Sequence, residues 1–378
     1  MRGVALAMAM AVAWPCLGGE PQASGEVVLD STEPLAATAD AGEGGTSRSV
    51  VVLPIPQASP TLGNGLVLAA VLFSQPEDSP RPWTTGVGVL WTDNGSRGGA
   101  VFHKGNRSAD AWRYSLFAGG ADLRLKFYGV GAAAGSSGVS IPIAQRGKAV
   151  QAELLRRFGA STYLGMRMRT VEIETSLRVE PPASRPDLEL PGLALESRLA
   201  GPGAVLQYDT RDSEQLPTRG TYVDGTLQWN LAAMDSDFGY SKVDVTWNHY
   251  RPFGARHVLA VRATGCRTGD AAPFYGLCLY GASNNLRGYE TGKYRDQALL
   301  ALQAEWRMQL TPRWGVVGFA GTGAVAGRFG DLADARRLPS AGMGVRFRAS
   351  SKFPVNISVD YARARDEDAV YFYIGEAF

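Results

Sequence analysis

From Val50 onward, apolar and polar residues alternate with a period of two. This is the pattern of β-strands that present one face to an apolar phase and the other to water. In the stretch 221–231 the apolar side chains stand at odd positions, and in 299–310 they stand at even positions, which turns Glu305 and Arg307 to the polar face. We therefore expect an all-β protein, a transmembrane antiparallel β-barrel of about 16 strands of the bacterial outer-membrane type.

The expected strands follow one another along residues 49–378, and each is of the length that crosses a tilted barrel wall. They are 66–73, 84–93, 98–104, 112–119, 122–129, 150–158, 162–171, 203–209, 220–231, 240–250, 257–267, 299–310, 314–325, 341–349, 354–363 and 369–378.

The connections between these strands support the barrel. Bacterial barrels have short periplasmic turns and longer outer loops, and the two alternate along the chain. Short connections at 94–97, 159–161, 311–313 and 350–353 follow even-numbered strands, and longer ones at 130–149, 172–202, 268–298 and 326–340 follow odd-numbered strands.

The first residues indicate export. Residues 1–19 hold one basic residue, Arg2, then an apolar run from Val4 to Trp14 and two small residues, which is typical of a secretory signal peptide. Pro15 makes a lipoprotein signal at Cys16 unfavourable. Residues 20–48 are rich in Gly, Ala, Ser, Thr and acidic residues without periodicity, and we expect a disordered linker there.

The last residues, 371–378, predict a final strand that closes the barrel. Phe372, Ile374 and Phe378 share one face of this strand, which would meet lipid. Gly375 offers no side chain to pack and Glu376 brings a charge, so we expect this closing strand to be held weakly. It would form a seam with the first strand, with Tyr373 close to Leu68.

Composition narrows the function classes. The 378 residues have a mean hydropathy of −0.10, as expected where strand faces average out, and 38 basic against 36 acidic residues, a net charge of +2. This balance argues against a nucleic-acid partner. Three His, on separate strands or turns, and three Cys leave little for a metal site, and we expect no cofactor and no enzyme. Cys266 and Cys278 are expected to form a disulfide in an oxidising compartment, or else to remain two unpaired small residues.

Two segments narrow the kind of barrel. The first runs from Gln207 to Gly220 and reads QYDTRDSEQLPTRG, and the second, Asn285–Tyr289, reads NLRGY and is followed by an acid at Glu305. Together they resemble the BamA/TamA family of outer-membrane proteins, also called the bacterial surface antigen family. The matching positions are Tyr208, Asp209, Arg211, Asp212, Pro217 and Gly220 in the first segment and Leu286, Arg287, Gly288 and Tyr289 in the second.

The resemblance implies a site inside the barrel. In the family the first segment forms a periplasmic turn, and the loop with the second folds back into the lumen, where its arginine meets acidic groups. Here that arginine is Arg287 and its partner Glu305, unless Arg287 lies on a solvated outer loop. The acid of the family's Phe-x-Asp-x-Gly motif is absent from Phe319–Gly323, so the pair would rest on Glu305 alone.

The resemblance also implies a function. The chain resembles the barrel-only members, without periplasmic polypeptide-transport-associated domains, and we expect an integral outer-membrane protein, surrounded by outer-membrane lipids, that assembles or inserts outer-membrane components. Its partners would be client outer-membrane proteins or a separate periplasmic protein. The alternatives are a passive channel or structural barrel plugged by the loop 268–298, and a membrane anchor for a periplasmic partner.

Overall fold

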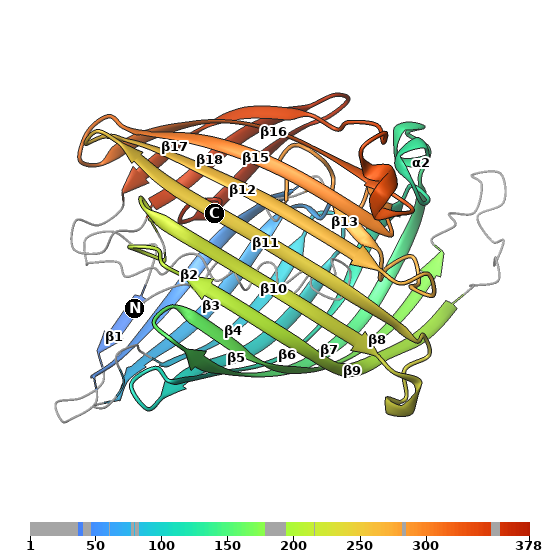
Figure 1. Cartoon of the computed structure of the whole chain (residues 1–378), viewed down its shortest axis with the longest axis horizontal. Helices are drawn as coiled ribbons and strands as arrows, with labels where there is room; N and C mark the ends of the chain where they lie inside the picture. Colours follow the sequence, from blue (N-terminus) through green and yellow to red (C-terminus); the bar gives the residue numbers. More distant parts are fainter. Residues whose placement is uncertain are drawn as a thin grey trace.

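The computed structural model describes residues 37–40, 47–59, 61–76, 79, 83–177, 194–214, 216–281, 285–348 and 356–378, and these form a tilted antiparallel barrel (Figure 1). The expected signal peptide, 1–19, lies outside the described residues. Within the range expected as a linker, 20–48, the described residues include a short strand, β1 (Ala37–Asp40), which pairs with β2.

Sixteen strands of the described chain make up the barrel wall, each antiparallel to its neighbours, and β19 lies beside β2 in the sheet order. The fold class expected from the alternation is confirmed. The strands are β2 (Ser47–Ser59), β3 (Gly63–Gln75), β4 (Trp83–Thr92), β5 (Arg97–Arg107), β6 (Trp112–Phe127), β7 (Ile141–Phe158), β8 (Thr162–Leu177), β9 (Ala194–Asp209), β10 (Gly220–Asn230), β11 (Tyr240–Phe253), β12 (His257–Thr268), β15 (Ala298–Gln309), β16 (Trp314–Ala326), β17 (Ser340–Arg348), β18 (Asn356–Ala364) and β19 (Asp368–Ile374).

The two faces of the wall differ as the alternation predicts. On β15, Leu302 and Trp306 point outward and are 50% and 43% exposed, whereas Glu305 points inward and is 0% exposed. Outward apolar side chains meet lipid, and inward polar ones must find partners in the lumen. The described helices are short: α2 (Ala132–Ser136) and the 3-10 turns Ala232–Met234 and Phe329–Leu332. Across the described ranges, no helix is long and apolar enough to span a membrane.

The expected number of strands is right because two errors cancel. β2 was not predicted, and the two expected strands 112–119 and 122–129 are one strand, β6, which pairs along its length with β7. Leu68 therefore lies on β3, the second barrel strand, and not at the seam. The seam is formed by β2 and β19.

Because β2 was not predicted, β4 was counted as the second strand, and the turn that follows it was assigned to the wrong end of the barrel. Because β4 is the third barrel strand, the turn 93–96 lies at the end that carries the long connections 128–140, 269–297 and 327–339, which we call the loop end. The connections 159–161 and 310–313 lie at the opposite end, where β17 ends and β18 begins, and we call it the turn end. The chain's last residue also lies at the turn end (Figure 1).

The C-terminal segment does not continue the wall. β19 ends at Ile374, and Gly375 adopts a φ of 95°, which a residue with a side chain rarely does. Phe372 is 44% exposed on the outer face, but Glu376 and Phe378 are only 4% and 3% exposed. The expectation that Phe378 shares the lipid face with Phe372 is therefore wrong, because the chain turns into the barrel at Gly375.

Candidate functional site

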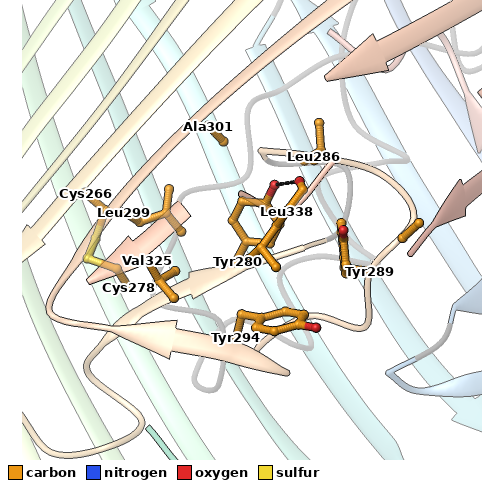
Figure 2. Close-up of a cluster of buried hydrophobic side chains, with 11 residues drawn as sticks. Cys266, Cys278, Tyr280, Leu286, Tyr289, Tyr294, Leu299, Ala301, Val325 and Leu338 are labelled. Carbon is orange, nitrogen blue, oxygen red and sulfur yellow. Dashed lines mark hydrogen bonds between the residues drawn. A yellow bond between two sulfur atoms is a disulfide. The ribbon is translucent and has the colours of Figure 1, made fainter. Parts of the chain in front are cut away.

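The connection between β12 and β15 folds into the barrel from the loop end. It contains a small hairpin, in which β13 (Cys278–Tyr280) pairs with β14 (Tyr294–Asp296). A disulfide joins Cys278 to Cys266 on β12, with 5.8 Å between the two Cα atoms (Figure 2). The base of the loop is thus covalently fixed to the barrel wall.

A cluster of buried tyrosines packs this loop in place (Figure 2). The ring centroids of Tyr280 and Tyr289 lie 5.4 Å apart, and those of Tyr289 and Tyr294 lie 5.5 Å apart, both pairs edge to face. The hydroxyl of Tyr280 donates to the carbonyl of Leu338 at 2.6 Å. The cluster therefore ties the loop to the neighbouring connection 327–339.

The tip of the loop, Asn285–Tyr289, lies deep in the barrel. The Asn285 side chain accepts a hydrogen bond from the amide of Gly281 at 2.8 Å, which closes the turn. Gly288 has a φ of 112°, and its amide donates to the Tyr371 hydroxyl of β19 at 2.9 Å. This conformation strains a residue with a side chain, so glycine at 288 sets the direction in which Arg287 enters the lumen.

Arg287 is the centre of a buried ionic network. Its Nη2 donates to Glu305 of β15 at 2.5 Å, and its Nη1 donates to Asp360 of β18. All three side chains are 0% exposed, and the guanidinium stacks 3.5 Å from the centroid of the Phe319 ring. The Arg287–Glu305 pair is the one expected from the sequence, and the solvated-loop alternative does not describe this arrangement.

The expectation that Glu305 is the sole acid is wrong, because Asp360 supplies a second. At the position where the family's motif has its acid, this chain has Gly321, and a Cβ built there would lie 2.3 Å from Leu286 Cδ1. Leu286 thus fills the space that a side chain at 321 would need. The second carboxylate enters instead from β18, opposite Gly344, whose lack of a side chain leaves room for Asp360.

Two more arginines extend the network toward the turn end. Arg307 of β15 donates to Glu305 at 2.7 Å. Arg346 of β17 donates to Asp360 at 2.5 Å and to Glu376 of the C-terminal segment at 2.8 Å. Three guanidinium groups thus face three carboxylates, which is how buried charges are tolerated away from water.

The turn segment 210–219 lies at the turn end beside this network, and the carbonyl of Pro217 accepts from Arg307. Asp209 and Arg211 form a two-pronged pair at 2.9 Å, and Arg211 lies over the ring of Tyr222. Asp212 accepts the hydroxyl of Thr218 and the amides of Thr218 at 2.9 Å and Arg219 at 3.2 Å. Burial alone would raise the pKa of Asp212, but these hydrogen bonds outweigh it and hold the pKa below its usual value.

The remaining residues of the turn motif have separate places. Tyr208 is 38% exposed on the outer face. Gly220 has a φ of 109°, and a Cβ there would lie 2.3 Å from the carbonyl oxygen of Thr210. Pro217 presents its carbonyl to Arg307 Nη1 at 3.3 Å.

Arg307 therefore joins the two motif segments. Besides Pro217 and Glu305, it donates to the main-chain oxygen of Phe378, whose ring lies 4.5 Å from the guanidinium of Arg262. A cavity of about 240 Å³ opens beside it at the turn end, lined among others by Pro217, Arg307, Arg346 and Glu376. The loop tip, the turn and the C-terminal segment thus meet in one network.

Sequence reasoning did not identify Asp360, Arg346 or Glu376 as members of this network. The alternation of β18 carried a usable signal, because its inward positions are Asn356, Ser358 and Asp360 while Ile357 and Val359 point outward. A carboxylate on the inward face of a strand needs a basic partner in the lumen. In the described part of the chain, no three His, Cys, Asp or Glu side chains are grouped to hold a metal ion.

Comparison with known proteins finds one matching family and similar barrel structures. Residues 74–378 match the model of the Omp85 superfamily domain. The structure of BamA from Haemophilus ducreyi lacking POTRA domains 1-3 is similar, with a TM-score of 0.55 and 15% identity, over 88% of this chain and 70% of that one. CdiB from Acinetobacter baumannii gives a TM-score of 0.56 and 12% identity, over 90% of this chain and 64% of that one. No curated protein matches the sequence.

Proposed function

We propose that this chain, which belongs to the Omp85 superfamily, is an outer-membrane barrel that assembles or inserts outer-membrane components through the seam between β2 and β19. The fold is the one that crosses bacterial outer membranes, with strands whose outer face is apolar. In this proposal the turn end faces the periplasm, and the partners are client outer-membrane proteins, lipids and a periplasmic protein.

The observation that carries the proposal is the direct contact between the lumenal network and the seam strand. Two inward residues of β19, Tyr371 and Tyr373, bond to the loop and to the network. Tyr371 accepts from the amide of Gly288 at 2.9 Å, and Tyr373 accepts from Arg346 at 2.8 Å. A change in the loop would therefore alter how β19 is held. A passive channel that is only plugged by the loop would not require a link between the loop and the strand at the seam.

Depletion of the protein, followed by quantitative proteomics of the outer membrane and an assay of lipid asymmetry, tests this function. Loss of several unrelated barrels supports assembly. An unchanged set of barrels contradicts it and favours the passive channel or the periplasmic anchor. A barrel with the seam locked by a disulfide, Ala58→Cys with Val370→Cys, expressed at the wild-type level, is the comparison, because it occupies the same membrane area and the proposal makes it inactive.

A further inference from the structure

The cavity at the turn end lies between three neighbouring turns. Its lining comes from the turns 210–219, 254–256 and 310–313 and from the ends of β17 and β18, and it reaches Arg307 and Arg346 of the buried network. Its volume of about 240 Å³ is well above the ~10–15 Å³ that a single water needs. The cavity therefore has room for a group larger than a water molecule.

A glycine keeps one wall of this cavity open. Gly315 of β16 is the register partner of Gln309 on one side and of Arg346 on the other. Residues directly opposite each other in a sheet share a face, so position 315 lies on the same inward face as Arg346. A Cβ built there would lie 3.2 Å from the carbonyl oxygen of Met308 and 3.5 Å from the Cβ of Arg346. A large side chain at 315 would therefore take up part of the cavity.

The lining carries an excess of positive charge. It contains five arginines and one carboxylate, that of Glu376. The two deeper arginines already have acidic partners, because Arg346 donates to Glu376 at 2.8 Å and Arg307 donates to Glu305 at 2.7 Å. The excess charge therefore belongs to the other three arginines of the lining.

These three, Arg256, Arg313 and Arg348, are called the rim arginines here. None of them forms an ion pair in the part of the chain that the structure describes. The Nε atom of Arg348 is buried without a hydrogen-bond partner. A buried donor without an acceptor costs free energy, and an acceptor that binds in the cavity removes this cost.

The backbone holds the rim arginines on adjacent strand ends. The amide of Gln309 donates to the carbonyl of Arg256 at 2.9 Å, and the amide of Arg348 donates to the carbonyl of Arg313 at 2.8 Å. Arg348 is also the register partner of Asn356, which is buried on the inward face, so its side chain starts from that face. Several guanidinium groups around one cavity suit an anion with several oxygens, because each offers a planar fork of N–H donors.

The outer face of the wall beside the rim arginines is aromatic. Phe253 and Trp314 point outward and are 45% and 48% exposed. The ring centroids of Trp314 and Phe347 lie 4.8 Å apart. Girdles of aromatic residues in outer-membrane barrels lie at the level of the lipid headgroups. The rim arginines therefore lie near the height of the lipid phosphates, and this favours a phosphate group over the carboxylates of an acidic peptide.

We propose that this cavity binds a phosphate group through the rim arginines. The phosphate is that of an anionic phospholipid in the leaflet at the turn end, or that of a soluble phosphate ester. The site goes beyond the proposed function and does not depend on opening of the seam. Its failure is therefore read separately from the depletion experiment.

Charge removal at the rim tests the site in the full chain, purified in a non-ionic detergent. The rim variant combines Arg256→Gln, Arg313→Gln and Arg348→Gln. The control variant removes the same charge at the turn end from exposed arginines of β5 and β7 that do not line the cavity: Arg107→Gln, Arg156→Gln and Arg157→Gln. Heat-modifiable gel mobility checks that both are folded, and the single variant Arg313→Gln, at an exposed turn position, is measured beside them.

Two probes separate the sources of the phosphate. Native mass spectrometry measures binding of phosphatidylglycerol, and isothermal titration calorimetry measures binding of glycerol 3-phosphate. We expect binding to weaken by about tenfold or more in the rim variant, to weaken in Arg313→Gln, and to stay unchanged in the control variant. Binding that is at least tenfold tighter for the lipid identifies a headgroup site, and equal affinities identify a site for soluble phosphate.

Equal binding by the wild-type, rim and control proteins would overturn the proposal, and so would binding of neither probe by the wild-type protein. A hexaglutamate peptide is titrated in parallel. If this peptide binds and loses affinity in the rim variant while neither phosphate probe binds, the cavity receives an acidic protein segment and the phosphate site is wrong.

Discussion

Arg287 and Asp360 lie 73 residues apart in the sequence and form an ion pair in which neither side chain has exposed surface. Together with Glu305, this pair fixes the loop tip to two strands of the wall, β15 and β18. Breaking a buried pair leaves a charge without a partner, and this costs more than the pair contributes when intact.

Arg287→Ala should therefore destabilise the barrel by on the order of 3 kcal/mol and loosen the loop. Arg307 and Arg346 remain beside Glu305 and Asp360, but the network then carries one carboxylate in excess. Combining Arg287→Ala with Glu305→Gln, or with Asp360→Asn, should be milder than Arg287→Ala alone. Heat-modifiable gel mobility measures the difference.

Lys148→Ala is the control, because Lys148 pairs with Glu172 at 3.6 Å on the surface, where the two side chains are 78% and 52% exposed. It should cost less than about 1 kcal/mol. Additive damage in the Arg287→Ala double variants would contradict the pairing.

Gly321→Ala should destabilise the barrel by about 1–3 kcal/mol, since the added carbon meets Leu286 Cδ1 at 2.3 Å and the carbonyl oxygen of Leu302 at 2.5 Å. Gly318→Ala on the same strand is the matched control, because nothing lies within 4 Å of a Cβ there. Thermal unfolding of both variants in detergent checks the prediction. Equal stability of the two would show that Leu286 does not fill this site.

The barrel could be predicted from the sequence because alternation is a local property of each strand. The identity of the two strands that form the seam could not be predicted in this way. Pro54 and Pro56 suggest a break in a strand, and only the position of β2 beside β19 explains why they are tolerated. Gly119 and Gly120 suggest a turn, yet β6 continues through them because β5 and β7 pair with it on both sides.

The lumenal site was predictable in part. Arg287 and Glu305 lie in segments that resemble a known motif. Asp360 and Arg346 do not, and they join the network through the curvature of the closed sheet, which brings β15, β17 and β18 around one loop tip. The inward turn of Glu376 and Phe378 depends on the conformation of one residue, Gly375, and a pattern of apolar positions does not record it.

The disulfide between Cys266 and Cys278 should protect both residues from thiol alkylation until the protein is reduced. Replacing both with alanine should cost about 2–3 kcal/mol, because the bridge closes a short loop. Mass spectrometry after alkylation, with and without reductant, measures the first effect. Labelling of both cysteines without a reductant would contradict the bridge.

The turn 210–219 should loosen at acid pH. The folded-state pKa of Asp212 lies below its ordinary value, so its carboxylate stabilises the turn above pH 4 and loses this effect as the pH falls through the folded-state pKa. Pepsin cleavage within 210–219 should accelerate as the pH is lowered from 4 to 2. In Asp212→Asn the turn should be cleaved at a rate that changes less over this range, and an unchanged pH profile would contradict the role of Asp212.

The central claim is that the seam between β2 and β19 must open for the protein to act. Ala58→Cys with Val370→Cys places one cysteine on each seam strand near the loop end and is designed to join the two strands under oxidising conditions. Leu68→Cys with Val89→Cys, a register pair of β3 and β4, is the control lock. In cells depleted of the wild-type protein, outer-membrane proteomics should show that the seam-locked protein fails to restore the barrels, that a reductant recovers them, and that the control lock restores them throughout. If the seam-locked protein restores a normal outer membrane that the depleted cell lacks, opening of the seam is not how this barrel works.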